Sequence, residues 1–142
     1  MNLQIRLVSN KKGLNQVINI RKAVFVQEQK VPINIEMDEH DNESEHFIAI
    51  MEGKPVGCAR VRTFENYIKL ERIAVLKEHR GNGFGKQITN FLIKYYKKKN
   101  IDEIRLHSQI SVADFYTKLG FKKRGEIFSE ADIEHIQMYI KN

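Results

Sequence analysis

The segment "EHRGNGFGKQI", residues 78–88, restricts the fold of this chain more than any other stretch, because it places three glycines within five positions. It leads into a segment whose apolar residues recur at the i, i+3, i+4, i+7 spacing of an amphipathic helix, namely Ile88, Phe91, Leu92 and Tyr95. Backbone N–H groups at a helix start lack partners within the helix, and the helix dipole makes that end mildly positive. A preceding turn without Cβ atoms lets an anion approach these donors. We therefore expect residues 80–86 to bind phosphate.

Two common phosphate-binding loops do not fit this segment. A Walker loop requires G-x-x-x-x-G-K-[ST], but Arg80 lies five positions before Gly85, and Gln87 follows Lys86. The dinucleotide fingerprint G-x-G-x-x-G also fails, because Gly85 comes only two residues after Gly83. A plain tight connection between a strand and a helix would need only one or two glycines. The segment is therefore predicted to be an anion-binding loop of another kind.

Apolar periodicity along the rest of the chain predicts a layered α/β fold with a mixed sheet. The expected order is β-α-β-β-β-α-β-α-β-β. Strands are expected at residues 3–8, 46–51, 55–64, 67–75, 101–107, 121–128 and 135–140, and helices at 14–29, from the glycines to about 100, and at 112–119. The acidic segment 36–46 has no periodicity and is predicted to be a loop. Ser111 and Asp114 are expected to cap the short helix, and Gly120 to end it.

Length and charge limit the class of protein. The 142 residues suit one domain, 1–142, and no apolar run approaches the roughly 20 residues of a membrane helix. The first ten residues lack the apolar region of a secretory signal, so we expect a cytoplasmic protein that binds no membrane. The net charge of +6 favours an anionic partner. "KYYKKK", residues 94–99, suggests nucleic acid, but cations at a helix C-terminus complement the dipole, and no helix-turn-helix or zinc spacing is present.

Cys58 is the single cysteine, so the chain has no internal disulfide, and no pair of histidines has the spacing of metal ligands. We expect Cys58 to be a small apolar residue in a strand, and we expect no metal site. The absence of an evident nucleophile with a basic partner favours direct attack on a substrate over a covalent enzyme intermediate.

The pattern R-x-x-G-x-G, residues 80–85, follows the strand "LERIAV" and resembles the acetyl-CoA loop of the GNAT superfamily of N-acetyltransferases. "FYTKLGF", residues 115–121, is similar to the second signature of that family, and the predicted element order is the family fold. The resemblance covers essentially the whole chain. "RKAVFVQEQKVP" and "HIQM" resemble the ElaA/YjcF-like branch. The resemblance implies that the loop amides hold the pyrophosphate of coenzyme A, and that the fourth and fifth strands splay to admit pantetheine.

Acetyl transfer from a thioester to an amine requires a neutral amine, a stabilised oxyanion and a proton for the departing thiolate. Tyr116 matches the family tyrosine that protonates the coenzyme A sulfur, although its place on an apolar helical stripe also suits a core residue. Glu71 matches a family position for a base that often acts through water. A glutamate is a weak base unless burial raises its pKa, and Glu71 equally suits an ion pair with Arg72 or Lys69.

The resemblance also implies two sets of binding residues. Those expected on the coenzyme A side are Ile73, Ala74, Val75, Arg80, Gly81, Asn82, Gly83, Phe84, Gly85, Lys86 and Gln109. Those expected in the acceptor pocket are Arg21, Phe25, Glu28, Gln29, Arg60 and His135. The predicted function is acetyl transfer from acetyl-CoA to a primary amine of a small molecule in a ternary complex. The alternative is a non-enzymatic acyl-CoA-binding regulatory module. An exposed terminal strand is compatible with a homodimer.

Overall fold

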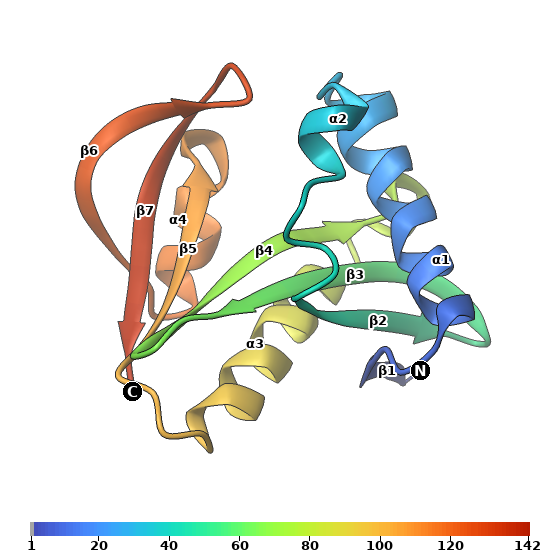
Figure 1. Cartoon of the computed structure of the whole chain (residues 1–142), viewed down its shortest axis with the longest axis horizontal. Helices are drawn as coiled ribbons and strands as arrows, with labels where there is room; N and C mark the ends of the chain where they lie inside the picture. Colours follow the sequence, from blue (N-terminus) through green and yellow to red (C-terminus); the bar gives the residue numbers. More distant parts are fainter. Residues whose placement is uncertain (1) are drawn as a thin grey trace.

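Residues with alternating apolar side chains form the strands of one sheet in the computed structural model, which describes residues 2–142 (Figure 1). The sheet has seven strands in the order β1-β2-β3-β4-β5-β7-β6, and only β4 and β5 pair in parallel. The strands are β1 (Leu3–Leu7), β2 (Glu45–Met51), β3 (Lys54–Thr63), β4 (Tyr67–Val75), β5 (Glu103–Gln109), β6 (Lys122–Glu130) and β7 (Ile133–Lys141).

Helices cover both faces of the sheet and create two apolar clusters. They are α1 (Lys11–Arg21), α2 (Ile33–Glu36), α3 (Phe84–Lys97) and α4 (Ala113–Lys118), with a π-helical turn η1 (Lys22–Glu28) and two 3₁₀ turns, η2 (Lys77–His79) and η3 (Ile110–Val112). The α1 side buries Val17 and Ile20 with Ile48 of the sheet. The other side is larger and buries Leu92 of α3 with Phe47, among others. Burial of these faces fixes both helices on the sheet.

The sheet opens between β4 and β5. These strands pair only from Tyr67 with Glu103 to Leu70 with Leu106. Beyond that point β5 continues to pair with β7 as far as Gln109, while the second half of β4 stays with β3. The opening lies at the carboxyl ends of two parallel strands, where ligands bind in open α/β sheets. The splayed strands expected from the family resemblance are therefore present.

A β-bulge interrupts β4 just beyond the last pair with β5. Glu71 pairs with Arg60 and Ala74 with Cys58, so two residues of β4, Arg72 and Ile73, stand opposite a single residue of β3. Arg72 has a φ of +54°, the left-handed conformation that such a bulge can require. The bulge breaks the strict alternation of β4 next to the opening.

The predicted order of strands and main helices is confirmed, and three local details differ from the prediction. The first helix gives way to the π-helical turn after Arg21 instead of continuing to residue 29. The third helix ends at Lys97. α4 begins after Val112 without any side-chain cap, so Ser111 and Asp114 do not form the expected capping pair. In the described part of the chain, no helix is long and apolar enough to span a membrane.

Candidate active site

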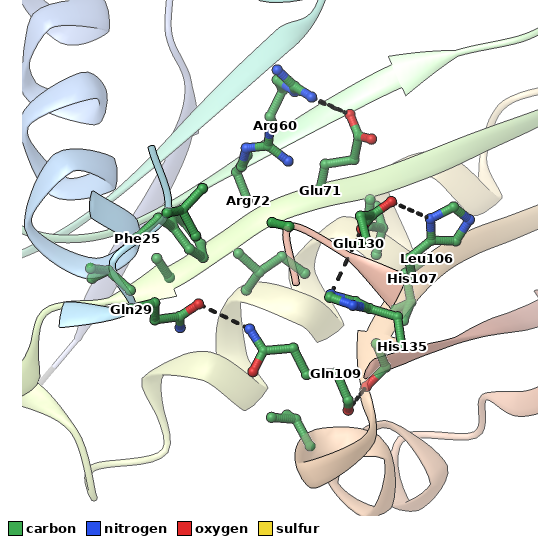
Figure 2. A pocket seen from close by; sticks show the side chains of 18 of the residues that line it. Phe25, Gln29, Arg60, Glu71, Arg72, Leu106, His107, Gln109, Glu130 and His135 are labelled. Carbon is green, nitrogen blue, oxygen red and sulfur yellow. Dashed lines mark hydrogen bonds and ion pairs between the residues drawn. The ribbon is translucent and has the colours of Figure 1, made fainter. Parts of the chain in front are cut away.

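A cavity of about 490 Å³ occupies the opening between β4 and β5. Its walls come from η1, β3, β4, the end of β5, η3, α4 and the β6–β7 hairpin, so elements far apart in the sequence meet here (Figure 2). Charged, polar and apolar side chains all line the cavity. Such a concave site at a break in the sheet is the natural candidate for an active site.

The glycine loop lies at the start of α3. Gly81 and Gly83 have φ angles of +84° and +77°, which a residue with a Cβ adopts only under strain. No side chain caps α3, and its first backbone bond runs from Gln87 N–H to Gly83 O. Among the described residues, the amides of residues 81–86 donate no hydrogen bond. The helix start therefore offers several free donors, as the sequence predicted for an anion-binding loop.

The Arg80 side chain bonds to β4 and to η1. Its Nε donates to Val75 O at 2.9 Å, and its Nη atoms donate to the Glu28 carboxylate at 2.9 and 2.7 Å. The hydrogen bond from Arg80 lowers the pKa of Glu28. Arg80 thus ties the glycine loop to β4 and η1. Glu28 does not line the cavity, and its place in the acceptor pocket stays a prediction from the sequence.

Glu71 lies in the cavity wall with both carboxylate oxygens occupied. Arg60 donates to Oε1 at 2.7 and 3.1 Å, and Lys69 lies 2.8 Å from Oε2. A third cation, Arg62, is 3.6 Å from Oε2. Burial acts to raise the pKa of Glu71, but the hydrogen bonds and charges of Lys69 and Arg60 outweigh it and lower that pKa. Glu71 is therefore a weaker base than a free glutamate, and the expected ion pair with Lys69 is present.

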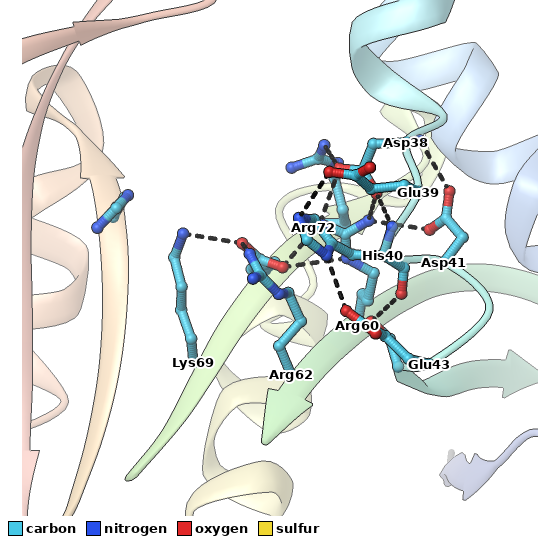
Figure 3. Close-up of polar contacts among 12 residues, drawn as sticks. Asp38, Glu39, His40, Asp41, Glu43, Arg60, Arg62, Lys69 and Arg72 are labelled. Atoms are coloured by element: carbon cyan, nitrogen blue, oxygen red, sulfur yellow. Dashed lines mark hydrogen bonds and ion pairs between the residues drawn. The ribbon is translucent and has the colours of Figure 1, made fainter. Parts of the chain in front are cut away.

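Behind Glu71 lies a network of buried arginines and acidic residues (Figure 3). Arg21 is fully buried, and its guanidinium donates to Glu36 at 2.8 Å and to Asp41 at 2.7 Å. Arg60 is 1% exposed and donates to Asp38 and Asp41 at 2.7 and 2.9 Å. Buried charges require such partners. Arg21 does not line the cavity and is bound to Glu36 and Asp41, and its role in acceptor binding stays a prediction from the sequence.

Four other predicted residues do line the cavity: Phe25, Gln29, Gln109 and His135. Gln109 Nε2 donates to Gln29 Oε1 at 2.9 Å, which joins the end of β5 to the residue that follows η1 across the opening (Figure 2). His135, at the start of β7, pairs in register with Gln109. These residues therefore meet around the mouth of the opening, although 80 positions separate Gln29 from Gln109.

Tyr116 of α4 also lines the cavity, as do Ile73, Ala74 and Val75 of β4. Burial raises the pKa of Tyr116 to about 12, so its hydroxyl stays protonated at neutral pH. Cys58 lies away from the cavity, and its Sγ donates to Arg72 O at 3.5 Å. Cys58 is 1% exposed, and burial raises the pKa of its thiol to about 12, which disfavours the reactive thiolate.

Sequence reasoning missed Glu130, which lines the cavity from the end of β6. Its Oε1 lies 3.1 Å from His107 Nδ1, and its Oε2 lies 3.7 Å from His135 Nε2. Glu130 stands next to a two-residue hairpin turn, Ala131 and Asp132, in which both residues have positive φ. Neither residue is a glycine or asparagine, so this position lacks a strong turn signal in the sequence. The acidic segment 36–46 likewise gave no sign that it folds onto buried arginines.

Three comparisons place these features among known proteins. Residues 9–142 match the family model described as "Acetyltransferase (GNAT) domain". The chain is 40% identical over 133 residues to the Bacillus subtilis (strain 168) protein named "Uncharacterized N-acetyltransferase YjcF", covering 93% of this chain and 95% of that protein. The crystal structure of Escherichia coli ElaA superposes with a TM-score of 0.83 over 97% of both chains at 24% identity.

A crystal structure of a Bacillus subtilis acetyltransferase in complex with CoA has the same fold, with a TM-score of 0.76, 20% identity and 99% coverage of both chains. The glycine loop and the splayed strands are the features expected of this family, and the family match covers residues 9–142. The chain therefore belongs to the GNAT acetyltransferase family.

Proposed function

We propose that this protein transfers an acetyl group from acetyl-CoA to a primary amine of a small molecule, by direct attack in a ternary complex. One observation carries the proposal: the amides of residues 81–86 donate no hydrogen bond among the described residues, and they lie at the helix start that follows the splayed strand β4. Acetyl-CoA combines a diphosphate with a long, thin thioester arm. The diphosphate suits the free amides, and the arm suits the opening between β4 and β5.

The residues present fit coenzyme A. The amides of residues 81–86 would hold the diphosphate, and Lys86 adds a positive charge at the same helix start. The Asn82 side chain donates to His79 O at 3.1 Å and thus supports the loop. Ile73, Ala74 and Val75 line the cavity at the bulge and just beyond it, where their backbone groups would bond the thioester arm. When bound, acetyl-CoA supplies an activated acetyl thioester.

Tyr116 would act as the general acid that protonates the departing sulfur. The raised pKa keeps the hydroxyl protonated at neutral pH, and Tyr116 can give this proton to the sulfur if it takes another from the attacking nitrogen in the same step. Backbone N–H groups at the β4 bulge, with that of Val75 as the first candidate, would stabilise the oxyanion. For Glu71 we propose charge compensation of Arg60 and Lys69 in the wall of the acceptor pocket, because its oxygens are occupied by these cations.

Direct transfer is supported by the state of Cys58. The thiol is buried, its pKa is raised, and it does not line the cavity, so it is unsuited to carry the acetyl group. Steady-state rates measured at several concentrations of both substrates should give intersecting double-reciprocal lines. Parallel lines, or an acetylated Cys58 in the intact protein by mass spectrometry, would contradict direct transfer.

The activity itself is tested with a panel of primary amines, including polyamines, amino sugars and amino acids. Release of coenzyme A thiol and the mass of the acetylated product are measured for each amine. We expect at least one amine to be acetylated. Tight acetyl-CoA binding without turnover of any amine would contradict the proposal and favour the acyl-CoA-binding module. A cytoplasmic location and a homodimer remain predictions from the sequence.

A further inference from the structure

His135 is a buried, titratable side chain for which the reaction above has no use. It is 7% exposed and lines the cavity beside the end of β5. Its Nδ1 lies 2.7 Å from Ile133 O. Because a carbonyl oxygen can only accept a hydrogen bond, Nδ1 must carry the proton and donate it. The neutral ring then has its free lone pair on Nε2.

The surroundings of Nε2 suit a proton acceptor. Glu130 Oε2 lies 3.7 Å away, close enough to stabilise a charged imidazole but too far to occupy the lone pair with a hydrogen bond. The hydrogen bond from His107 lowers the pKa of Glu130, so this carboxylate is ionised. Phe128 stacks on the His135 ring with the centroids 6.0 Å apart and helps to hold it in place. The other titratable and charged residues that line the cavity from β3, β4 and β5 are Arg60, Arg62, Lys69, Glu71, Arg72 and His107.

The alternative bases in the cavity wall are less suitable. Both oxygens of Glu71 are occupied by cations, and its pKa is lowered. Glu130 is occupied by His107. Tyr116 is protonated and serves as the acid. Histidine is the side chain best matched to proton transfer near neutral pH.

We propose that Nε2 of His135 is the general base that deprotonates the acceptor amine, with Glu130 as the residue that stabilises the charge on the imidazole. This inference rests on the proposed acetyl transfer. Nε2 accepts one proton from the acceptor's ammonium group, and the free amine forms a bond to the acetyl carbon. While the carbon–sulfur bond breaks, Tyr116 gives its proton to the sulfur and takes the second proton from the nitrogen. His135 then releases its proton to water, so both protons are accounted for.

The first test is His135→Asn. The asparagine Nδ2 can still donate to Ile133 O, as Nδ1 does, but the base at Nε2 is gone. With the amine from the panel that reacts fastest, we expect kcat/KM at pH 7 to fall about 100-fold or more, while acetyl-CoA affinity stays as in the wild type. The rate of the variant should rise about tenfold per pH unit up to the pKa of the amine, because only the free amine then reacts. His40→Asn makes the same change at a partly exposed position outside the cavity and should leave kcat/KM unchanged.

The second test needs no turnover. Long-range ¹H–¹⁵N NMR spectra of the imidazole rings report which nitrogen carries the proton. We expect the neutral His135 ring to be protonated on Nδ1, and a ring protonated on Nε2 would overturn the inference. So would wild-type kcat/KM in His135→Asn. If the wild type acetylates amines but His135→Asn is unimpaired, this inference alone fails. If the wild type binds acetyl-CoA but acetylates no amine, the proposed function fails, and the inference fails with it.

Discussion

Tyr116 gives the clearest prediction at the scale of single residues. Among the described residues its hydroxyl has no hydrogen-bond partner, so Tyr116→Phe removes the proton donor without breaking a contact. We expect kcat to fall about 100-fold or more, because general acid catalysis contributes that much. The melting temperature and the affinity for coenzyme A should stay within error of the wild type.

Tyr95→Phe is the matched control. Tyr95 packs on Phe47 and Phe91, on the α3 side of the sheet and outside the cavity. We expect this variant to retain the wild-type kcat. Equal activity of Tyr116→Phe and Tyr95→Phe would remove Tyr116 from the proposed mechanism.

Single residues also show where sequence reasoning reaches its limit. The position of Tyr116 follows from a short local signature, and the structure brings it to the cavity. The ion pairing of Glu71 with Arg60 cannot be predicted from the segment around Glu71, because Arg60 comes from another strand. The free nitrogen of His135 depends on one carbonyl, Ile133 O, and on the turn that places Glu130 nearby. A side chain's chemistry is set by neighbours that are distant in the sequence.

At the scale of elements, the glycine loop allows a matched pair of substitutions. Gly83 and Gly53 have φ angles of +77° and +78°, and a Cβ at either position would meet nothing within 4 Å. Alanine should therefore cost each variant a similar strain, on the order of 1 kcal/mol of unfolding free energy. Only Gly83→Ala places a methyl group beside the free amides of α3.

We expect calorimetry to show weaker coenzyme A binding, by about tenfold or more, for Gly83→Ala, and wild-type affinity for Gly53→Ala. The two variants should show similar losses of stability in urea. If both variants bind coenzyme A equally well, the loop is only a structural connection.

Elements were predicted best where one periodic pattern spans the whole segment. α3 and the strands β2 and β3 follow directly from apolar spacing. The π-helical turn after Arg21 was not predicted, because an apolar stripe is similar in both kinds of helix. The bulge at Arg72 was also missed, since a bulge depends on pairing with β3 and leaves no pattern in β4 alone.

At the scale of the whole molecule, the buried ionic network couples the acidic loop to the sheet and should make stability depend on pH. Burial acts to raise the pKa values of Glu71, Asp38 and Asp41, but contacts with cations outweigh it and lower these pKa values. A group with a lowered pKa in the folded state stabilises the fold above its unfolded-state pKa, and this contribution is lost as pH falls through the folded-state value. Burial raises the pKa of Glu36, so the contribution of Glu36 to the pH dependence of stability has the opposite sign. It is one group against three.

The unfolding free energy from urea titrations should therefore decrease as pH falls below about 4.5, the ordinary pKa of a glutamate. Each unit by which a folded-state pKa is lowered corresponds to about 1.4 kcal/mol. Glu71→Gln should be less stable than the wild type at pH 7 and should show a shallower pH dependence.

Glu39→Gln, on the exposed part of the same loop, should follow the wild-type curve. A wild-type stability that does not change between pH 5 and pH 3 would contradict the proposed contribution of the network. We further expect one cooperative unfolding transition, because both apolar clusters pack on the same sheet.

The central claim is that the free amides at the start of α3 hold the diphosphate of acetyl-CoA. The most direct measurement is the ¹H–¹⁵N NMR spectrum of the backbone amides during titration with coenzyme A. We predict that the largest shifts occur at residues 81–86, with smaller shifts along Ile73 to Val75. Saturating binding that leaves the resonances of residues 81–86 in place, or no binding by the folded protein, would contradict the account.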